Sequence, residues 1–248
     1  MQQFILLTMM FGLQSSPISL DKIHSSDPTL FTQGFEQIND RQLLIASGLY
    51  GQSQIGILNK QTGDFESLDT LDKSIFGEGV TQTPYGIWQL TWKNGQAFLR
   101  DSETFEVVQT VTYDTEGWGI AYDATEDCLW MSDGSDTLYQ RDAQTFELLS
   151  QYHIKDGNGQ SVKFLNELEY VDGRIYANIW YTQSVVAISK DTMRVEKVYD
   201  FTQILEDVKV SQAEREKMDV LNGIAHKEGR QFYITGKYYP VILEVTLN

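Results

Sequence analysis

The sequence contains a single cysteine, Cys128, and only three histidines, His24, His153 and His226. One cysteine excludes an intramolecular disulfide, a thiolate zinc cluster and a CxxC redox pair. No two histidines have the short helical spacing of a zinc hydrolase, so we interpret each as an ordinary surface or strand residue. A metal centre built on sulfur or on several histidines is therefore not expected.

Basic residues are also scarce, with 19 Lys and Arg against 35 Asp and Glu in 248 residues, which gives a net charge of −16. This excess of negative charge repels nucleic acid and anionic lipid, so we expect neither a nucleic-acid partner nor stable membrane association. Hydrophobic residues make up 41% of the chain, aromatic residues 12%, and there are only 4 prolines. That composition is typical of a packed globular protein and excludes a disordered chain.

Long hydrophobic runs are absent except for residues 4–13 (FILLTMMFGL), which precede Gln-Ser-Ser-Pro (14–17). The run has the length of a signal-peptide core and is too short to span a bilayer. No Lys or Arg precedes it, since the first is Lys22, and the cleavage pattern is poor. The alternative is a buried terminal strand. We interpret residues 1–15 as a signal-like segment, which favours a periplasmic or extracellular location over a cytoplasmic one.

Five short turns recur along the chain and define an internal repeat. They are Phe-Thr-Gln-Gly (31–34), Phe-Gly-Glu-Gly (76–79), Glu-Gly-Trp-Gly (116–119), Leu-Asn-Glu-Leu (165–168) and Leu-Asn-Gly-Ile (221–224). The residues at their equivalent positions, 45, 40, 48 and 56 residues apart, are Gln33, Glu78, Trp118, Asn166 and Asn222. A period of about 40 to 50 residues indicates a propeller or a solenoid.

Strand-like runs rich in β-branched and aromatic residues follow each turn. The strongest internal match is the string Arg-Asp-(Ser/Ala)-(Glu/Gln)-Thr-Phe-Glu, which occurs at 100–106 and at 141–147. The last repeat has only about three strands, whereas residues 17–24 (PISLDKIH) precede the first turn and fit no other repeat. We therefore predict an all-β fold, a five-bladed β-propeller in one domain over residues 16–248, whose N-terminal strand closes the last blade.

The longest spacing carries about twelve surplus residues relative to the usual blade period. Residues 201–218 (FTQILEDVKVSQAEREKM) contain few turn residues and follow a helical pattern. We predict one inserted surface helix there, with its charged side chains in solvent.

Equivalent positions of the blades converge on the axis of a propeller, so the five turn residues are expected to form a ring at one mouth of the channel. A second layer follows fourteen or fifteen residues later, at Ser47/Gly48, Trp92, Asp133, Trp180 and Lys237. The two layers combine a carboxylate, amides, three tryptophans and a lysine. Apolar walls with a few convergent polar groups are typical of a small-molecule pocket.

Glu78 is the candidate catalytic residue of this pocket. Because glycines flank it and aromatic residues surround it, we expect burial to raise the pKa of its carboxyl toward the range of a proton shuttle. The structural alternative is a glutamate that caps strand ends. Trp92, Trp118 and Trp180 are equally consistent with packing between blades, and Lys237 with a solvated turn.

Other catalytic signatures are missing from the chain. It has no GxSxG elbow, no P-loop and no GxGxxG after a strand. Glu167 and Glu169 alternate with apolar neighbours, and we interpret them as acceptors of hydrogen bonds between blades rather than as channel-facing acids. No DxDxDG loop supports a calcium site. An acidic channel could nevertheless hold a structural Ca²⁺, so this alternative stays open.

Ten motifs, in order along the chain, resemble those of glutamine cyclotransferases, the plant and bacterial type of glutaminyl-peptide cyclotransferase. They cover nearly everything after residue 18. The motifs are Phe-Thr-Gln-Gly (31–34), Ser-Gly-Leu-Tyr-Gly-Gln-Ser (47–53), Phe-Gly-Glu-Gly-Val-Thr (76–81), Gln-Leu-Thr-Trp-Lys (89–93), Glu-Gly-Trp-Gly (116–119), Ser-Asp-Gly-Ser (132–135), Leu-Asn-Glu-Leu-Glu (165–169), Ala-Asn-Ile-Trp (177–180), Asp-Val-Leu-Asn-Gly-Ile-Ala (219–225) and Thr-Gly-Lys (235–237). One departure is Tyr-Tyr-Pro (238–240), where the family often has a tryptophan after the lysine.

The resemblance implies cyclisation of an N-terminal glutamine, or more slowly glutamate, to pyroglutamate with release of ammonia, without catalytic zinc or another cofactor. It also implies peptide or protein substrates with N-terminal Gln or Glu, and we expect a monomer. Glu78 would be the general acid and base, and the Trp118 indole would bind the side-chain amide of the substrate. The other implied substrate-binding residues are Gln33, Asn166 and Lys237 for the amine and carbonyls, and Phe31, Phe76, Trp92 and Trp180 for the apolar walls.

Two other function classes fit the residues less well. One is a non-catalytic propeller that binds a peptide or sugar through its tryptophan-lined mouth. The other is a Ca²⁺-dependent, lactonase-like propeller, against which the Gly-Glu-Gly setting and five rather than six blades argue. Release of ammonia from a Gln-peptide, measured with and without EDTA, separates the three.

Overall fold

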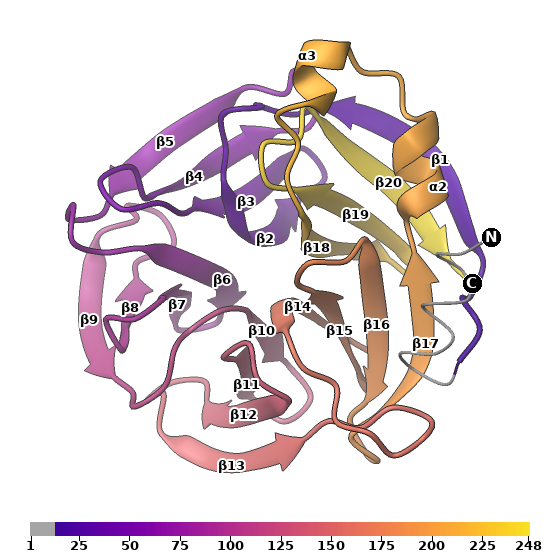
Figure 1. Ribbon diagram of the computed structural model, residues 1–248. Coiled ribbons are helices and arrows are strands. Elements are labelled where there is room, and N and C mark those ends of the chain that lie inside the picture. The colour runs from indigo at the N-terminus through magenta and orange to yellow at the C-terminus, as the bar shows by residue number, and fades with distance from the viewer. Residues whose placement is uncertain (1–12) are drawn as a thin grey trace.

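The computed structural model describes residues 13–248, so most of the signal-like segment, residues 1–12, lies outside the described residues. Twenty strands form five four-stranded antiparallel sheets, which radiate from a common axis (Figure 1). The predicted all-β, five-bladed propeller is confirmed. Among the described residues, no helix is long and apolar enough to cross a bilayer.

The five blades follow one another along the chain. Blade one contains β2 (Thr32–Asn39), β3 (Gln42–Ser47), β4 (Gln54–Asn59) and β5 (Phe65–Thr70). Blade two contains β6 (Gly77–Thr83), β7 (Gly86–Thr91), β8 (Gln96–Arg100) and β9 (Val107–Thr112). Blade three contains β10 (Ile120–Asp123), β11 (Cys128–Ser132), β12 (Thr137–Asp142) and β13 (Leu148–His153). Blade four contains β14 (Leu165–Val171), β15 (Arg174–Ile179), β16 (Ser184–Ser189) and β17 (Arg194–Asp200). Blade five contains β18 (Leu221–Glu228), β19 (Gln231–Gly236), β20 (Val241–Leu247) and, on its outer edge, β1 (Ile18–Ser25).

Burial changes from the inside of a blade to its rim. All six residues of β7 are buried, because both faces of this strand pack against neighbouring blades. The outer strand β9 is mostly exposed and carries polar residues between its valines. The hydrophobic core therefore lies between adjacent blades, around the axis.

The innermost strands β2, β6, β10, β14 and β18 pack against one another around the axis (Figure 1). Each begins at or directly after one of the five repeated turns. Glycine in these turns allows the close approach: a Cβ at Gly79 would lie 2.7 Å from the Trp118 carbonyl oxygen, which accepts the Gly79 N–H at 2.8 Å. The repeat thus fixes how near neighbouring blades come at the mouth of the channel.

The ring is closed by the first described strand. β1 pairs antiparallel with β20, and the sheet order is β1-β20-β19-β18, as predicted (Figure 1). The Glu244 carboxylate of β20 accepts hydrogen bonds from His24 of β1 at 2.7 Å and from Lys227 of β18 at 2.8 Å. These contacts connect the N-terminal strand to blade five as its fourth and outermost strand.

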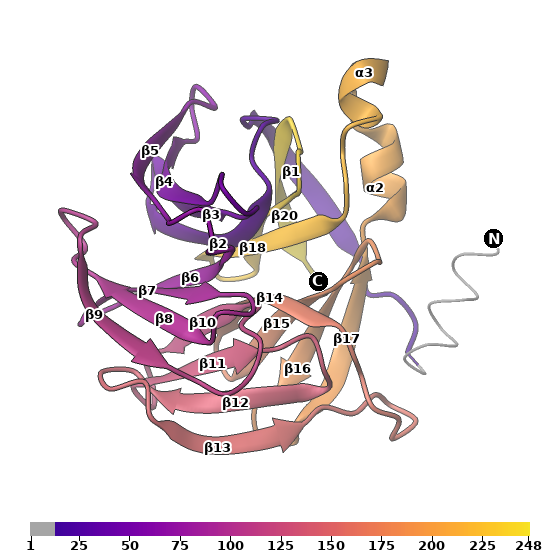
Figure 2. The ribbon, with the colours of Figure 1, turned by 60° about the vertical axis from the view of Figure 1, so that its left-hand side comes forward.

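The predicted inserted helix is instead two short helices, α2 (Thr202–Asp207) and α3 (Gln212–Arg215), beside blade five and away from the axis (Figure 2). The chain leaves α2 at Val208 in an extended conformation. A new helix starts at Ser211, whose side chain accepts the Glu214 N–H while the Glu214 carboxylate accepts the Ser211 N–H. The capping box marks the start of a separate second helix, whereas the sequence pattern had predicted one continuous helix.

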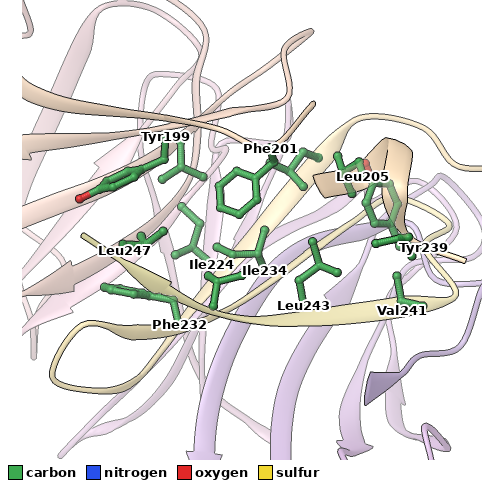
Figure 3. Close-up of a cluster of buried hydrophobic side chains, with 14 of the residues drawn as sticks. Tyr199, Phe201, Leu205, Ile224, Phe232, Ile234, Tyr239, Val241, Leu243 and Leu247 are labelled. Atoms are coloured by element: carbon green, nitrogen blue, oxygen red, sulfur yellow. The ribbon is translucent and has the colours of Figure 1, made fainter. Parts of the chain in front are cut away.

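The first of these helices is not purely a surface element. Leu205 of α2 is buried in the cluster between blades four and five, near Tyr239 and Val241 (Figure 3). Phe201 and Phe232 belong to the same cluster and are fully buried. The insertion therefore adds to the core of the last blade.

Candidate active site

A cavity of about 220 Å³ opens at the mouth of the channel, where the inner strands begin. Its walls are formed by all nine predicted site residues: Phe31, Gln33, Phe76, Glu78, Trp92, Trp118, Asn166, Trp180 and Lys237. Four of these belong to the five-membered ring of turn residues. The fifth ring residue, Asn222, lies behind the cavity wall rather than on it.

Two residues of the predicted second layer also lie outside the cavity. The Asp133 carboxylate accepts hydrogen bonds from Ser135 and from the Tyr139 hydroxyl, so it is used within blade three. Ser47 accepts the Phe31 N–H at 3.0 Å and so supports one cavity wall from behind.

Glu78 lies on β6 and is only 4% exposed. Burial raises the pKa of its carboxyl well above the ordinary value of 4.5; the charge of Lys237 acts against this shift and that of Glu116 adds to it. The Gln33 amide donates a hydrogen bond to Glu78 Oε1 at 3.0 Å. A buried carboxyl with one oriented oxygen and a raised pKa is suited to moving protons.

A chain of amides fixes that orientation. Asn222 Nδ2 donates to the Thr32 carbonyl at 3.0 Å and to Gln33 Oε1 at 3.1 Å. Because Gln33 Oε1 is used as an acceptor, its Nε2 is the atom directed at Glu78. Asn222 is therefore a positioning residue for the carboxylate, one layer behind the cavity.

Lys237 follows β19 and is 5% exposed, so it is not a solvated turn lysine. Burial lowers the pKa of its ammonium, while the charge of Glu78 raises it. Its Nζ lies 4.5 Å from the centroid of the Phe31 ring. Among the described residues no ion pair joins Lys237 to Glu78, so both groups remain available to a ligand between them.

Asn166 lies on β14 and is 3% exposed. Its Oδ1 is buried and accepts no hydrogen bond from any described residue. A buried acceptor without a donor costs free energy, so such groups are uncommon in native structures. This oxygen is therefore a candidate partner for an N–H of a bound molecule.

The indole walls share one acceptor that the sequence did not indicate. Glu116 Oε2 accepts the Trp92 N–H at 2.7 Å and the Trp118 N–H at 3.0 Å. The resemblance assigned the Trp118 N–H to the substrate amide, but here that proton is donated to Glu116. A substrate can use it only by sharing it or by displacing Glu116.

Further aromatic rings extend the walls outward. Tyr50 packs on Phe76 at 5.4 Å, and Tyr181 stacks on Trp180 at 3.7 Å between ring centroids. Tyr50 is 48% and Tyr181 68% exposed, so they form a rim open to solvent. Tyr50 lies inside one of the ten motifs, but no pattern in the sequence marked either ring as part of the mouth.

Glu167 and Glu169 are acceptors between blades, as predicted. Glu167 accepts the Ile224 N–H at 2.7 Å and the Phe35 N–H at 3.3 Å, and Glu169 accepts the His226 N–H at 2.8 Å. Their carboxylates therefore bond the inner strand of blade four to its neighbours.

One set of described residues has the donor atoms of a metal site: Asp123, Glu126 and Cys128. The Lys190 ammonium already contacts two of them, at 3.3 Å from Asp123 and 2.7 Å from Glu126. A lysine thus fills the place of a cation there. This cluster lies in blade three, outside the cavity described above.

Comparisons with known proteins agree with this architecture. A family described as glutamine cyclotransferase matches residues 12–247. A glutaminyl-peptide cyclotransferase from Arabidopsis thaliana is 32% identical over 256 residues, covering 95% of this chain and 76% of the plant protein.

One solved structure points to the same family, and a second shares only the fold. The crystal structure of Myxococcus xanthus glutaminyl cyclase superposes with a TM-score of 0.79 at 30% identity, over 93% of this chain and 96% of the other. A Bacteroides thetaiotaomicron protein of unknown function, at 11% identity and a TM-score of 0.55 over 93% of this chain and 76% of its own, shares the fold alone. The chain belongs to the glutamine cyclotransferase family.

Proposed function

We propose that this protein is a glutaminyl-peptide cyclotransferase that converts an N-terminal glutamine, or more slowly glutamate, to pyroglutamate, with Glu78 as general acid and base. Glutamine releases ammonia in the reaction, and glutamate releases water. The observation that carries the proposal is the buried Glu78 carboxyl, with its raised pKa, in a cavity with Lys237 and Asn166. Family membership supports the same reaction.

The reaction joins two groups of one residue. The α-amine nitrogen attacks the side-chain amide carbon, the new C–N bond closes a five-membered ring, and the bond from that carbon to the amide nitrogen then breaks. Because nucleophile and electrophile are already linked, the enzyme needs to hold the ring-forming rotamer and to move protons. The reaction involves no change of oxidation state and needs no group-carrying cofactor.

Glu78 supplies both proton transfers. As a carboxylate it takes a proton from the attacking amine, and as a carboxylic acid it gives a proton to the departing amide nitrogen, which leaves as ammonia. The carboxylate is regenerated at the end of the cycle. Because Gln33 donates to Oε1, we assign the proton transfers to Oε2.

The remaining polar groups bind the substrate. Asn166 Oδ1 has no donor among the described residues and is suited to accept an N–H of the α-amine. The Lys237 ammonium is suited to a carbonyl oxygen that gains negative charge as the amine attacks. Aromatic walls from Phe76 and Trp180 exclude water, which strengthens both interactions.

A cavity of this size holds one terminal residue, and the rest of a peptide leaves through the open mouth. We therefore propose peptides and proteins with N-terminal Gln or Glu as substrates. The enzyme is proposed to act as an exported monomer that needs no catalytic cofactor, with a structural Ca²⁺ as an additional option.

The test is a coupled ammonia assay on a short peptide with N-terminal glutamine, with and without EDTA. We expect ammonia release that EDTA leaves unchanged, and none from the same peptide with an acetylated amine, because the nucleophile is blocked. Binding without ammonia release would favour the non-catalytic propeller. Turnover that EDTA abolishes would favour metal-dependent chemistry.

A further inference from the structure

Two buried arginines occupy the same position in adjacent blades. Arg100 of β8 pairs with Ile87, and Arg141 of β12 pairs with Leu129 in the equivalent register. Both belong to the repeated string Arg-Asp-(Ser/Ala)-(Glu/Gln)-Thr-Phe-Glu. Arg100 is 1% and Arg141 6% exposed. The repeat therefore provides an internal comparison of two guanidinium sites.

The Arg100 site is complete. Its Nη1 donates to the Asp69 carboxylate at 2.6 Å and to the Phe105 carbonyl at 2.7 Å, and its Nε donates to Gln89 Oε1 at 2.9 Å. A carboxylate, an amide and a backbone carbonyl together satisfy this buried cation.

The Arg141 site retains one of these three partners. Nη1 donates to the Phe146 carbonyl at 3.1 Å, which corresponds to the Phe105 contact. Val111 stands where blade one has Asp69, since Val111 pairs with Ala97 as Asp69 pairs with Ile55. Met131 likewise stands in the place of Gln89.

Two losses leave the guanidinium with unused donors. Arg141 Nε is buried and has no hydrogen-bond partner among the described residues, and no ion pair within residues 13–248 includes Arg141. Burial lowers the pKa of this guanidinium, and Tyr113, Tyr139 and the charge of Asp114 act against that shift without forming an ion pair. Burial of an unpaired cation lowers the stability of the fold. A bound anion at Arg141 would remove this cost.

The blade itself does not need an arginine at this position. The equivalent residues of the other three blades are aliphatic and fully buried: Leu58, Ile188 and Val245. An aliphatic side chain at position 141 would therefore satisfy the fold without the cost of a buried charge.

Arg141 faces a second cavity, of about 460 Å³, between blades two and three. The guanidinium carbon lies 4.8 Å from the centroid of the Phe146 ring and 5.5 Å from that of Tyr113, which provide an apolar lining. Thr115 Oγ1, also in this lining, is a second buried group with no hydrogen-bond partner in the described chain. Among residues 13–248, the acids that line this cavity are Asp114 and Glu147, and both are exposed.

We propose that this second cavity binds a carboxylate, which pairs with Arg141 as the Asp69 carboxylate pairs with Arg100, and that Thr115 contributes a further hydrogen bond. The aromatic lining favours an acid with an apolar body, and the negative rim from Asp114 and Glu147 favours a single carboxylate over a dianion. The carboxylate is that of a small free acid or of an acidic residue in a peptide, and the two sources share the same recognition chemistry. The site is separate from the cavity that contains Glu78.

The test is titration of the full chain with benzoate, with uncharged benzamide and with an N-acetylated, C-terminally amidated peptide that contains one glutamate, followed by calorimetry and by NMR shifts. We expect benzoate to bind at least about 10-fold more tightly than benzamide, because a charge-assisted pair with Arg141 distinguishes them. Binding of benzoate alone indicates a small-acid site, and binding of the peptide alone indicates a peptide site. Equal binding of benzoate and benzamide, or no binding of either acid, overturns the proposal.

The matched variant is Val111→Asp, which installs the carboxylate that blade one already has. It is expected to weaken acid binding at least about 10-fold while raising the melting temperature, because the new aspartate pairs with Arg141. The reciprocal variant Asp69→Val removes the partner of Arg100 and is expected to create acid binding at the equivalent place in blade two. Unchanged acid binding in Val111→Asp would contradict the assignment to Arg141. Glu103→Gln, an exposed change on blade two, is the control.

Discussion

At the scale of single residues, the site depends on two buried charges whose pKa values move toward each other. Burial raises the pKa of Glu78 and lowers that of Lys237. Only the carboxylate form of Glu78 can accept the amine proton, so kcat/KM should fall on the acid side as Glu78 is protonated. We expect the midpoint of that fall well above pH 4.5, the ordinary value for glutamate.

The check is a pH profile of kcat/KM in the wild type and in Lys237→Met. The Lys237 charge stabilises the Glu78 carboxylate, so its removal should move the acid midpoint to higher pH, besides lowering kcat. An acid-side midpoint near pH 4.5, or a midpoint that is the same in the wild type and in Lys237→Met, would contradict this account of the cavity.

Glu116 gives a second prediction at this scale. It accepts both the Trp92 and the Trp118 N–H groups, so Glu116→Ala should release the two indoles and raise KM about 10-fold. Glu116→Gln keeps an acceptor oxygen and should stay near wild type. Steady-state kinetics with tryptophan fluorescence measures both effects. Equal KM values in the two variants would argue that the shared acceptor has no role in binding.

At the scale of elements, the repeat predicted where the inner strands begin. Each inner strand starts at or directly after one of the five repeated turns, and these turns lie close together around the axis. The helical insertion was predicted as one element, although Ser-Gln-Ala-Glu (211–214) has the sequence of a capping box that starts a new helix. Glu116 was missed because its role depends on two indoles from different blades. The lost partners of Arg141 are visible only once the strand register is known.

The closing strand β1 carries a prediction of its own. Burial raises the pKa of Glu244, but hydrogen bonds from Lys227 and His24 outweigh it and leave the pKa below the ordinary value. Glu244→Gln should therefore lower the free energy of unfolding by about 1 to 3 kcal/mol at neutral pH. This contribution is present above the pKa of the unfolded chain and is lost as pH falls through the folded pKa.

Urea unfolding at neutral pH and near pH 3, with hydrogen exchange of β1, measures this effect. The exposed change Glu228→Gln is the control on the same blade. A destabilisation that persists undiminished at the acid pH would show that the charge of Glu244 is not its cause.

At the scale of the whole molecule, the inner strands of the blades carry acids whose pKa values are raised by burial between the blades. Burial, and then the charge of Glu169, raises the pKa of Glu36 to about 8, while burial raises the pKa of Glu169 to about 7. In the unfolded chain both titrate near the ordinary value of 4.5. Between these values the folded state binds more protons, so stability should fall as pH rises.

The expected slope is at most about 1.4 kcal/mol per pH unit for each extra proton. Glu36→Gln removes one titrating group and should flatten the dependence between about pH 5 and pH 8. Urea unfolding across that range is the measurement. Stability that instead rises with pH, equally in both proteins, would contradict protonated acids between the inner strands.

The central claim, that the Glu78 carboxyl moves the protons of the reaction, is tested most directly by ammonia release from Glu78→Gln. The amide keeps the shape of the side chain but cannot exchange the proton, so kcat should fall at least about 10²-fold. The variant should fold, with a free energy of unfolding equal to or higher than that of the wild type, because a buried carboxyl is removed. With Glu103→Gln as control, turnover of Glu78→Gln within about threefold of the wild type would remove Glu78 from the mechanism.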